Sequence, residues 1–142
     1  MFLRSLLSLL LVAGMVDAAS AESSGAAQLV NTIPDSSNKL VKLTSSGVSP
    51  QILHMSLQDS IVFFLNDTKD SLTTLEIDFG TKHMHCNGSN MRADSDGKAR
   101  SARPFGPRDF AATCFHEPGT FQYKVFGLNS NPSGVTGTIV VQ

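Results

Sequence analysis

The sequence predicts an all-β fold in which two sheets pack as a sandwich. About seven short segments rich in β-branched and aromatic residues recur along the chain at the spacing typical of sandwich domains. Clusters of Gly, Pro, Asn, Asp and Ser separate these segments, as turns require. Beyond the first 21 residues, no run of apolar residues has the 3.6-residue period of an amphipathic helix.

The expected strands are segments in which apolar and polar side chains alternate. Leu75, Ile77 and Phe79 show the pattern clearly, because every second side chain of an extended segment shares one face. His54 is expected on the exposed face of its strand. The expected strands are residues 39–43, 52–57, 60–65, 72–79, 109–113, 120–126 and 137–142.

Residues 80–108 interrupt this rhythm, and we expect them to form a long irregular loop. The segment is locally basic, which leaves two interpretations open: a solvated face, or a site for an anion. Its charged residues are Arg92, Lys98, Arg100, Arg103 and Arg108, with Asp94 and Asp96 as acids.

Composition limits the class of protein. The chain has 142 residues, of which 41% are hydrophobic and 16% are charged, and its formal net charge is −1. This length fits one small domain and excludes a large enzyme, while the apolar fraction is sufficient for a packed core. The near-zero charge argues against nucleic acid or an anionic membrane as partner. We therefore expect an unidentified protein or a metal ion as the partner.

The first 21 residues have the features of a signal peptide. A short basic start is followed by the apolar residues 6–16 and by Ala19-Ser20-Ala21, a small-x-small cleavage pattern. The apolar run is shorter than the roughly 20 residues of a membrane span, although a retained anchor is the alternative. We expect a flexible segment at residues 22–38 and one β domain at residues 39–142. The mature protein is then periplasmic or secreted, with no membrane association after cleavage.

Three motifs occur in order along residues 40–142. They are Gly47-Val48-Ser49-Pro50 followed by Leu53, Met55, Asp59, Ile61 and Phe63; Pro118-Gly119-Thr120-Phe121-Gln122-Tyr123; and Gly137-Thr138-Ile139-Val140-Val141. Together they resemble the opening strands, the P-G-T-Y-x-Y turn and the last strand of the cupredoxins. The resemblance implies a Greek-key β-sandwich of about seven or eight strands. In blue-copper cupredoxins, one end of this sandwich holds a copper ion for electron transfer.

The positions that supply copper ligands in this family differ here. A blue-copper site needs two imidazoles and a thiolate, usually with an axial Met. The resemblance places the first His within residues 71–76, the thiolate at Val125, and the remaining ligands within residues 126–135, yet none of these residues is His, Cys or Met. We therefore expect no type 1 copper site at these positions.

The two cysteines are Cys86 and Cys114, and the cupredoxin chain path implies that both lie at the end opposite the usual copper site. Two cysteines in an exported domain most often form a disulfide. This bridge would close a loop of about 28 residues and add about 3–4 kcal/mol of stability through the unfolded state. A thiolate metal site and free thiols are the alternatives.

Metal-capable side chains cluster around both cysteines. Imidazole, thioether and thiolate groups suit Cu(I), Cu(II) or Zn(II), so a metal site is one interpretation, and solvent-facing histidines in a polar loop are the other. No cofactor is certain, and copper is the candidate. The candidate metal ligands are His83, Met84, His85, Cys86, Cys114 and His116.

No catalytic motif occurs in the chain, and we predict that it is not an enzyme. Glu76 and Asp78 share an exposed strand face, where paired acids usually serve solubility. Asn66 and Asn87 begin glycosylation sequons.

The sequence predicts an exported binding or accessory protein without type 1 copper. We expect this protein to handle copper or another metal through the His/Met/Cys loop, which is the segment His83-Met84-His85-Cys86. The alternative is a periplasmic electron-transfer protein with an atypical copper site.

Overall fold

A computed structural model describes residues 38–58, 61–84, 86 and 88–142, all of which belong to one compact unit. The expected signal peptide and the expected flexible segment up to residue 37 lie outside these residues. Asn38, the last residue of that segment, already belongs to the first strand. No helix in the described part of the chain is long and apolar enough to span a membrane.

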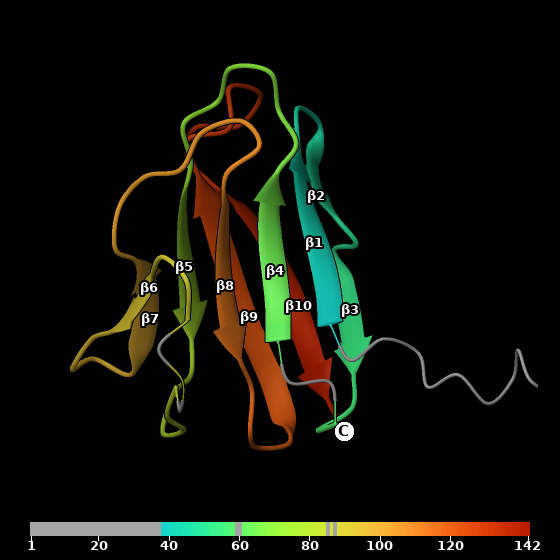
Figure 1. Ribbon diagram of the computed structural model, residues 1–142, viewed down its shortest axis with the longest axis vertical. Helices are drawn as coiled ribbons and strands as arrows, with labels where there is room; N and C mark the ends of the chain where they lie inside the picture. The colour runs from blue at the N-terminus through green and yellow to red at the C-terminus, as the bar shows by residue number, and fades with distance from the viewer. Residues whose placement is uncertain (1–37, 59–60, 85, 87) are drawn as a thin grey trace, which may run out of the picture. The chain divides into compact units, whose positions relative to one another are not determined.

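The described residues form two mixed sheets that pack face to face, so the all-β sandwich is confirmed (Figure 1). One sheet has the strand order β2 (Gly47–Ser49), β1 (Asn38–Thr44), β4 (Ile61–Asn66) and β8 (Phe110–Cys114). The other has the order β3 (Ile52–Met55), β10 (Val135–Val141), β9 (Gly119–Phe126), β5 (Thr74–Asp78), β7 (Lys98–Ser101) and β6 (Met91–Ala93). The β1–β4 and β3–β10 pairs are parallel, and the other pairs are antiparallel.

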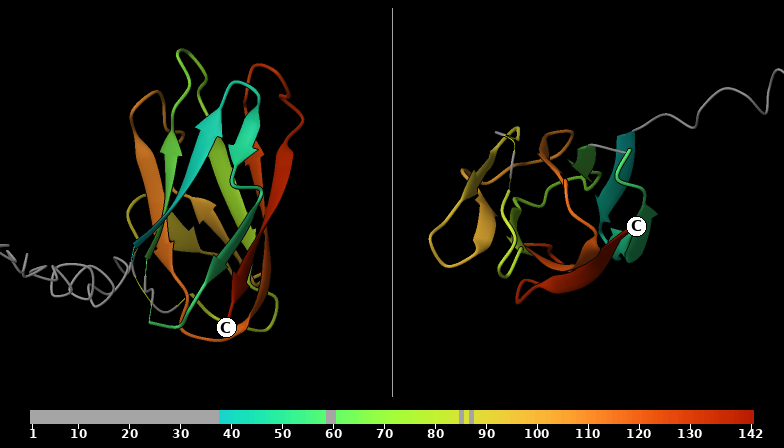
Figure 2. Two further views of the ribbon diagram at one scale, coloured as in Figure 1. Left: turned by 90° about the vertical axis from the view of Figure 1, so that its right-hand side faces the viewer. Right: turned by 90° about the horizontal axis from the view of Figure 1, so that it is seen from below.

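The expectation of a single irregular loop at residues 80–108 is wrong. β6 and β7 lie within this segment, and β7 pairs with β5, so the hairpin extends the larger sheet (Figure 2). These strands are short, and their main buried side chains are Met91 and Ala99, so their alternation is too weak to recognise in the sequence. β2 is also absent from the expected strands. The described residues therefore form ten strands rather than seven or eight.

The core lies between the sheets and follows the predicted alternation. Leu75 and Ile77 are buried from β5, with Phe79 just beyond it. Tyr123 lies at the centre, where burial raises its pKa to about 12. Gly137 faces its ring so closely that a Cβ there would lie 2.2 Å from ring atoms, so no larger residue fits.

The two ends of the sandwich carry different features. β5 and β8 both run toward the end at which residues 79–84, 86, 88–89 and 115–118 lie, which we call the disulfide end (Figure 1). The opposite end, the loop end, is formed by residues 67–73, 104–109 and 127–134 and by the strand residues next to them in β4, β5, β9 and β10. At the disulfide end, three aromatic rings pack together with centroids 4.9–5.4 Å apart: Phe79, Phe115 and Phe121.

Candidate functional site

The loop end contains every position at which the resemblance placed a copper ligand. Leu75 in β5 pairs with Val125 in β9, and Val125 pairs in turn with Val135 in β10. Val125 is completely buried. The fold therefore brings the expected positions together, but the side chains that meet there are apolar.

Asn66 fills the polar part of the loop end. Its side chain is fully buried, and its amide nitrogen donates to the carbonyl oxygens of Ser71 at 2.9 Å and Phe105 at 3.0 Å. Its amide oxygen accepts from the backbone nitrogen of Thr68 at 3.1 Å and from its hydroxyl at 2.6 Å. One amide thus ties the end of β4 to residues 68–71 and to Phe105. The first sequon has no exposed amide for a glycan in this fold, and Asn87 of the second lies outside the described residues.

The segment after β9 closes the loop end further. Leu128 is fully buried, and the backbone nitrogen of Asn129 donates to the hydroxyl of Ser71 at 3.2 Å. Gly127 has a φ of 86°, and a Cβ there would lie 2.2 Å from the carbonyl oxygen of Leu72. This segment is therefore packed directly against the chain that precedes β5.

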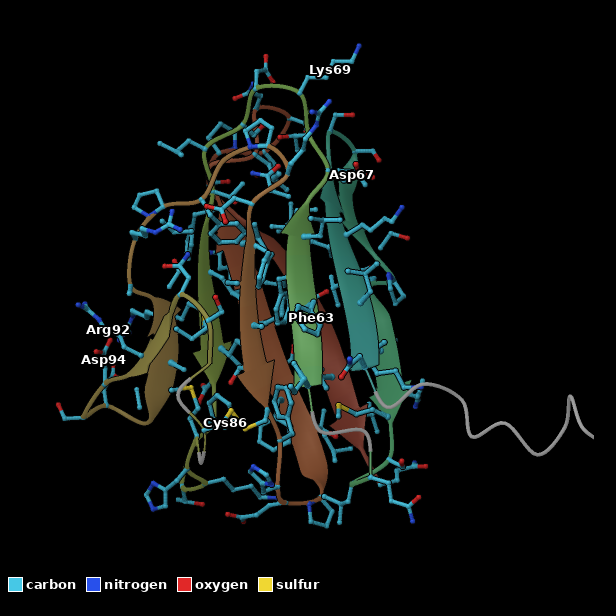
Figure 3. The ribbon with its side chains drawn as sticks, viewed as in Figure 1. Phe63, Asp67, Lys69, Cys86, Arg92 and Asp94 are labelled. Atoms are coloured by element: carbon cyan, nitrogen blue, oxygen red, sulfur yellow. A yellow bond between two sulfur atoms is a disulfide. The ribbon has the colours of Figure 1, made fainter. Side chains whose placement is uncertain are left out.

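Cys86 and Cys114 form a disulfide at the opposite end, with Cα atoms 6.1 Å apart (Figure 3). The predicted pairing is confirmed, and so is the end of the sandwich at which it lies. Because the sulfur atoms are bonded to each other, neither is a thiolate in this structure, and neither is a free thiol.

The candidate histidines and methionine have separate environments. The Nε2 atom of His116 lies 3.2 Å from the Sγ atom of Cys114, and its side chain is exposed. His83 is also exposed, whereas Met84 is partly buried and packs against the core. His85 lies outside the described residues. Within the described ranges, no three His, Cys, Asp or Glu side chains form a group that could hold a metal.

An apolar hollow of about 500 Å³ opens on the outer face of the four-stranded sheet, beside the disulfide. Its floor is Ala112 in β8, which pairs with Phe63 in β4. The rings of Phe63 and Phe110 have centroids 5.6 Å apart, and Figure 3 shows Phe63 near the middle of β4. The hollow is lined by Ile61, Phe63, Cys86, Gly88, Ser89, Phe110, Ala112, Thr113, Cys114 and His116.

The hollow was not predicted from the sequence. The signal for it is the continuous apolar run of β4, in which Ile61, Phe63 and Leu65 remain partly exposed while the alternate residues are buried. A strand with apolar side chains on both faces of its sheet is typical of a surface that is covered by something else.

The loop that carries Cys86 lies directly along β8. The backbone nitrogen of Ala112 donates to the carbonyl oxygen of Ser89 at 2.8 Å. A Cβ at Gly88 would lie 1.9 Å from the carbonyl oxygen of Ala112, so only glycine allows this approach. The loop therefore covers part of the edge of β8, which would otherwise present unpaired backbone groups.

The cations of residues 80–108 include two that pair with acids of the same sheet. Arg100 contacts Glu76 at 2.8 Å and Asp94 at 2.6 Å, and Lys98 contacts Glu76 at 2.7 Å. The hydrogen bond from Lys98 lowers the pKa of Glu76. Lys98 and Arg100 are thus neutralised within the sheet, and Glu76 joins β5 to β7 rather than serving only solubility.

Solved structures with a similar architecture include amicyanin and auracyanin. A Cu(I) form of an amicyanin variant, in which one methionine is replaced by alanine, matches 79% of this chain and 88% of its own, with a TM-score of 0.51 and 14% identity. The fold is that of the cupredoxins. A dithionite-reduced auracyanin from Roseiflexus castenholzii matches 75% of this chain and 98% of its own, with a TM-score of 0.49 and 14% identity. No protein-family model and no curated protein matches the chain.

Within this cupredoxin fold, the side chains that could bind a metal lie at the end opposite the one at which the resemblance placed the copper ligands. The loop end, where the resemblance placed the copper ligands, holds Asn66, Val125 and Leu128 in buried packing. The sulfur atoms, His116 and the apolar hollow lie together at the disulfide end. The disulfide end is therefore the candidate functional site.

Proposed function

We propose that this chain is an exported, non-enzymatic binding or accessory protein that works without a type 1 copper centre at the loop end. The observation that carries the proposal is the buried hydrogen-bond network of Asn66, next to the buried Val125. A type 1 centre needs two imidazoles and a thiolate around one ion, and this packing supplies none of them.

The binding role is supported by the apolar hollow. Burial of apolar surface is the main favourable term in association, and a concave apolar surface with a few polar groups at its rim is the usual form of a binding site. Phe63, Phe110 and Ala112 supply the apolar lining, and His116 supplies a polar group.

A metal-handling role rests on the disulfide end, and copper is the first metal to test because the amicyanin structure is a Cu(I) form. The electron-transfer alternative needs a permanent thiolate ligand. The bonded Cys86 and Cys114 do not favour it.

Probe binding tests the role of the hollow. We expect the apolar dye anilinonaphthalene sulfonate to bind the folded protein and to bind far less to Ala112→Leu, because the larger side chain fills the hollow. Ala102→Leu is the matched control, since Ala102 is exposed and does not line the hollow. Equal dye binding by wild type and Ala112→Leu, with both folded, would contradict a binding site at the hollow.

A further inference from the structure

The disulfide end places three potential metal ligands at one corner of the hollow. Cys114 ends β8, and His116 follows two residues later, with its Nε2 atom 3.2 Å from the Cys114 sulfur. Cys86 approaches from the neighbouring loop. All three residues line the hollow, which gives this corner a route to solvent.

The spacing of these groups is close to that of ligands on a single ion. Metal–sulfur bonds of about 2.3 Å at tetrahedral angles set two sulfur atoms about 3.8 Å apart, and a sulfur and an imidazole nitrogen about 3.6 Å apart. The present sulfur–nitrogen distance is 3.2 Å. The Cα atoms of the two cysteines are 6.1 Å apart, so small side-chain rotations are sufficient to separate the sulfur atoms.

We propose that reduction of the Cys86–Cys114 disulfide converts this corner into a binding site for a thiophilic cation such as Cu(I) or Zn(II), with both thiolates and the His116 imidazole as ligands. This inference rests on the proposed metal-handling function. It specifies where the metal binds and that reduction of the disulfide switches binding on. The disulfide form is the closed state, and the dithiol form is the binding state.

Reduction of the Cys86–Cys114 disulfide requires an external reductant, and a small-molecule or protein dithiol can serve. The dithiol donates two electrons and two protons, its own sulfur atoms become a disulfide, and Cys86 and Cys114 become thiols. The cation then displaces two protons, which pass to solvent, as the two thiolates bind it, and the His116 imidazole binds it through a ring nitrogen. The hollow leaves a fourth coordination position open to solvent or to a metal donor.

The ligands stay together after reduction because other contacts hold both segments. The Ala112–Ser89 hydrogen bond of 2.8 Å and the close packing of Gly88 keep the loop of Cys86 against β8. On the other side, Phe115 is almost fully buried and stacks on Phe79 at 5.4 Å, which fixes the chain between Cys114 and His116. The site is therefore organised in part before any metal binds, which lowers the cost of ordering it.

Cd(II) titration of the oxidised and the reduced protein tests the proposal. A phosphine reductant is applied and then removed without oxygen, and the near-ultraviolet thiolate-to-Cd(II) absorption is followed. We expect one Cd(II) per reduced chain with this absorption, and no such absorption in the oxidised protein. Cys86→Ser and Cys114→Ser should each abolish the tight site. His116→Gln should lower the Cd(II) affinity at least about tenfold, because replacing even a residue that only supports a metal ligand typically costs that much affinity.

His54→Gln is the matched control, because His54 is an exposed histidine on β3, away from the hollow. It should leave the Cd(II) affinity unchanged. Circular dichroism of the reduced protein, with the Cys86→Ser/Cys114→Ser double variant as reference, reports whether the sandwich stays folded.

A folded reduced protein without thiolate absorption would overturn the proposal, as would a reduced protein that unfolds. Equal weakening by His116→Gln and His54→Gln would remove His116 from the ligand set as proposed. These results leave the proposed binding function standing, because different results contradict it: copper binding at the loop end, or equal dye binding by wild type and Ala112→Leu.

Discussion

At the scale of single residues, the buried Asn66 occupies the polar centre of the loop end with hydrogen bonds instead of a metal ligand. An amide has two N–H donors and an oxygen that accepts two hydrogen bonds, and Asn66 directs these groups to three residues: Thr68, Ser71 and Phe105. In a buried position such bonds are costly to leave unmade. The residue that begins a sequon is therefore a structural residue of this fold.

Asn66→Ala should lower the free energy of unfolding by about 3 kcal/mol, because the carbonyl oxygens of Ser71 and Phe105 lose a buried donor. Denaturant unfolding measures the loss. Asn129→Ala is the control, since the Asn129 side chain bonds to Asp70 at the surface, and its loss should cost less than about 1 kcal/mol. Similar losses in the two variants would contradict the importance of burial here.

Gly88 should be essential for the close approach of its loop to β8. Gly88→Ala should destabilise the protein by about 1–3 kcal/mol, because the new Cβ collides with the backbone of β8. Hydrogen exchange at the Ala112 amide, which bonds to Ser89, should also become faster. Gly106→Ala serves as control, since its Cβ would meet only Leu72 at 3.9 Å. Unchanged exchange at Ala112 would mean that the loop adapts without leaving β8.

At the scale of elements, the sequence predicts strongly alternating strands better than short or charged ones. Seven of the described strands were expected, with ends that shift by a few residues. β2, β6 and β7 were missed, because each has only three or four residues, and β6 and β7 also include charged side chains. β7 pairs with β5, a partner remote in sequence, and local alternation contains no information about such a pairing.

The charge network that joins β5 to β7 gives a pH-dependent prediction. Glu76 has a lowered pKa in the folded chain, chiefly through its hydrogen bond from Lys98, so its contribution to stability is complete above the unfolded-state pKa. The contribution is lost as pH falls through the folded-state pKa. Glu76→Gln should therefore lower stability by about 1 kcal/mol at neutral pH, and less at strongly acidic pH.

Unfolding of wild type and Glu76→Gln as a function of pH measures this difference. Asp67→Asn is the control, because Asp67 forms only an exposed pair with Lys42 at 3.6 Å, and a change below about 0.5 kcal/mol is expected. A Glu76→Gln difference that grows toward acidic pH would have the opposite sign and would contradict the network.

At the scale of the whole molecule, the candidate site was only partly predictable. The cupredoxin resemblance predicted the end at which Cys86 and Cys114 meet, because strand direction follows from the chain path. It did not predict the hollow, which depends on a small residue, Ala112, between Phe63 and Phe110 on neighbouring strands. The grouping of His83, His85 and His116 stays a prediction, since His85 lies outside the described residues.

The disulfide should stabilise the whole domain. Replacement of both Cys86 and Cys114 by Ser should lower the free energy of unfolding by about 2–4 kcal/mol, since the unfolded chain regains the freedom of the closed loop. The intact mass of untreated wild type should be lower by about two hydrogens than that of the reduced protein. A mass that reduction does not change would mean that the bridge is absent in solution.

The central claim is that this cupredoxin fold has no copper site at its loop end. Paramagnetic broadening of backbone amide signals by Cu(II), added to the oxidised isotope-labelled protein, tests it most directly because it locates the ion. We predict no specific broadening at Thr74, Val125 and Leu128, and that any specific broadening centres on His83 and His116. Broadening centred on Val125 and Leu128, with stoichiometric binding, would contradict the account.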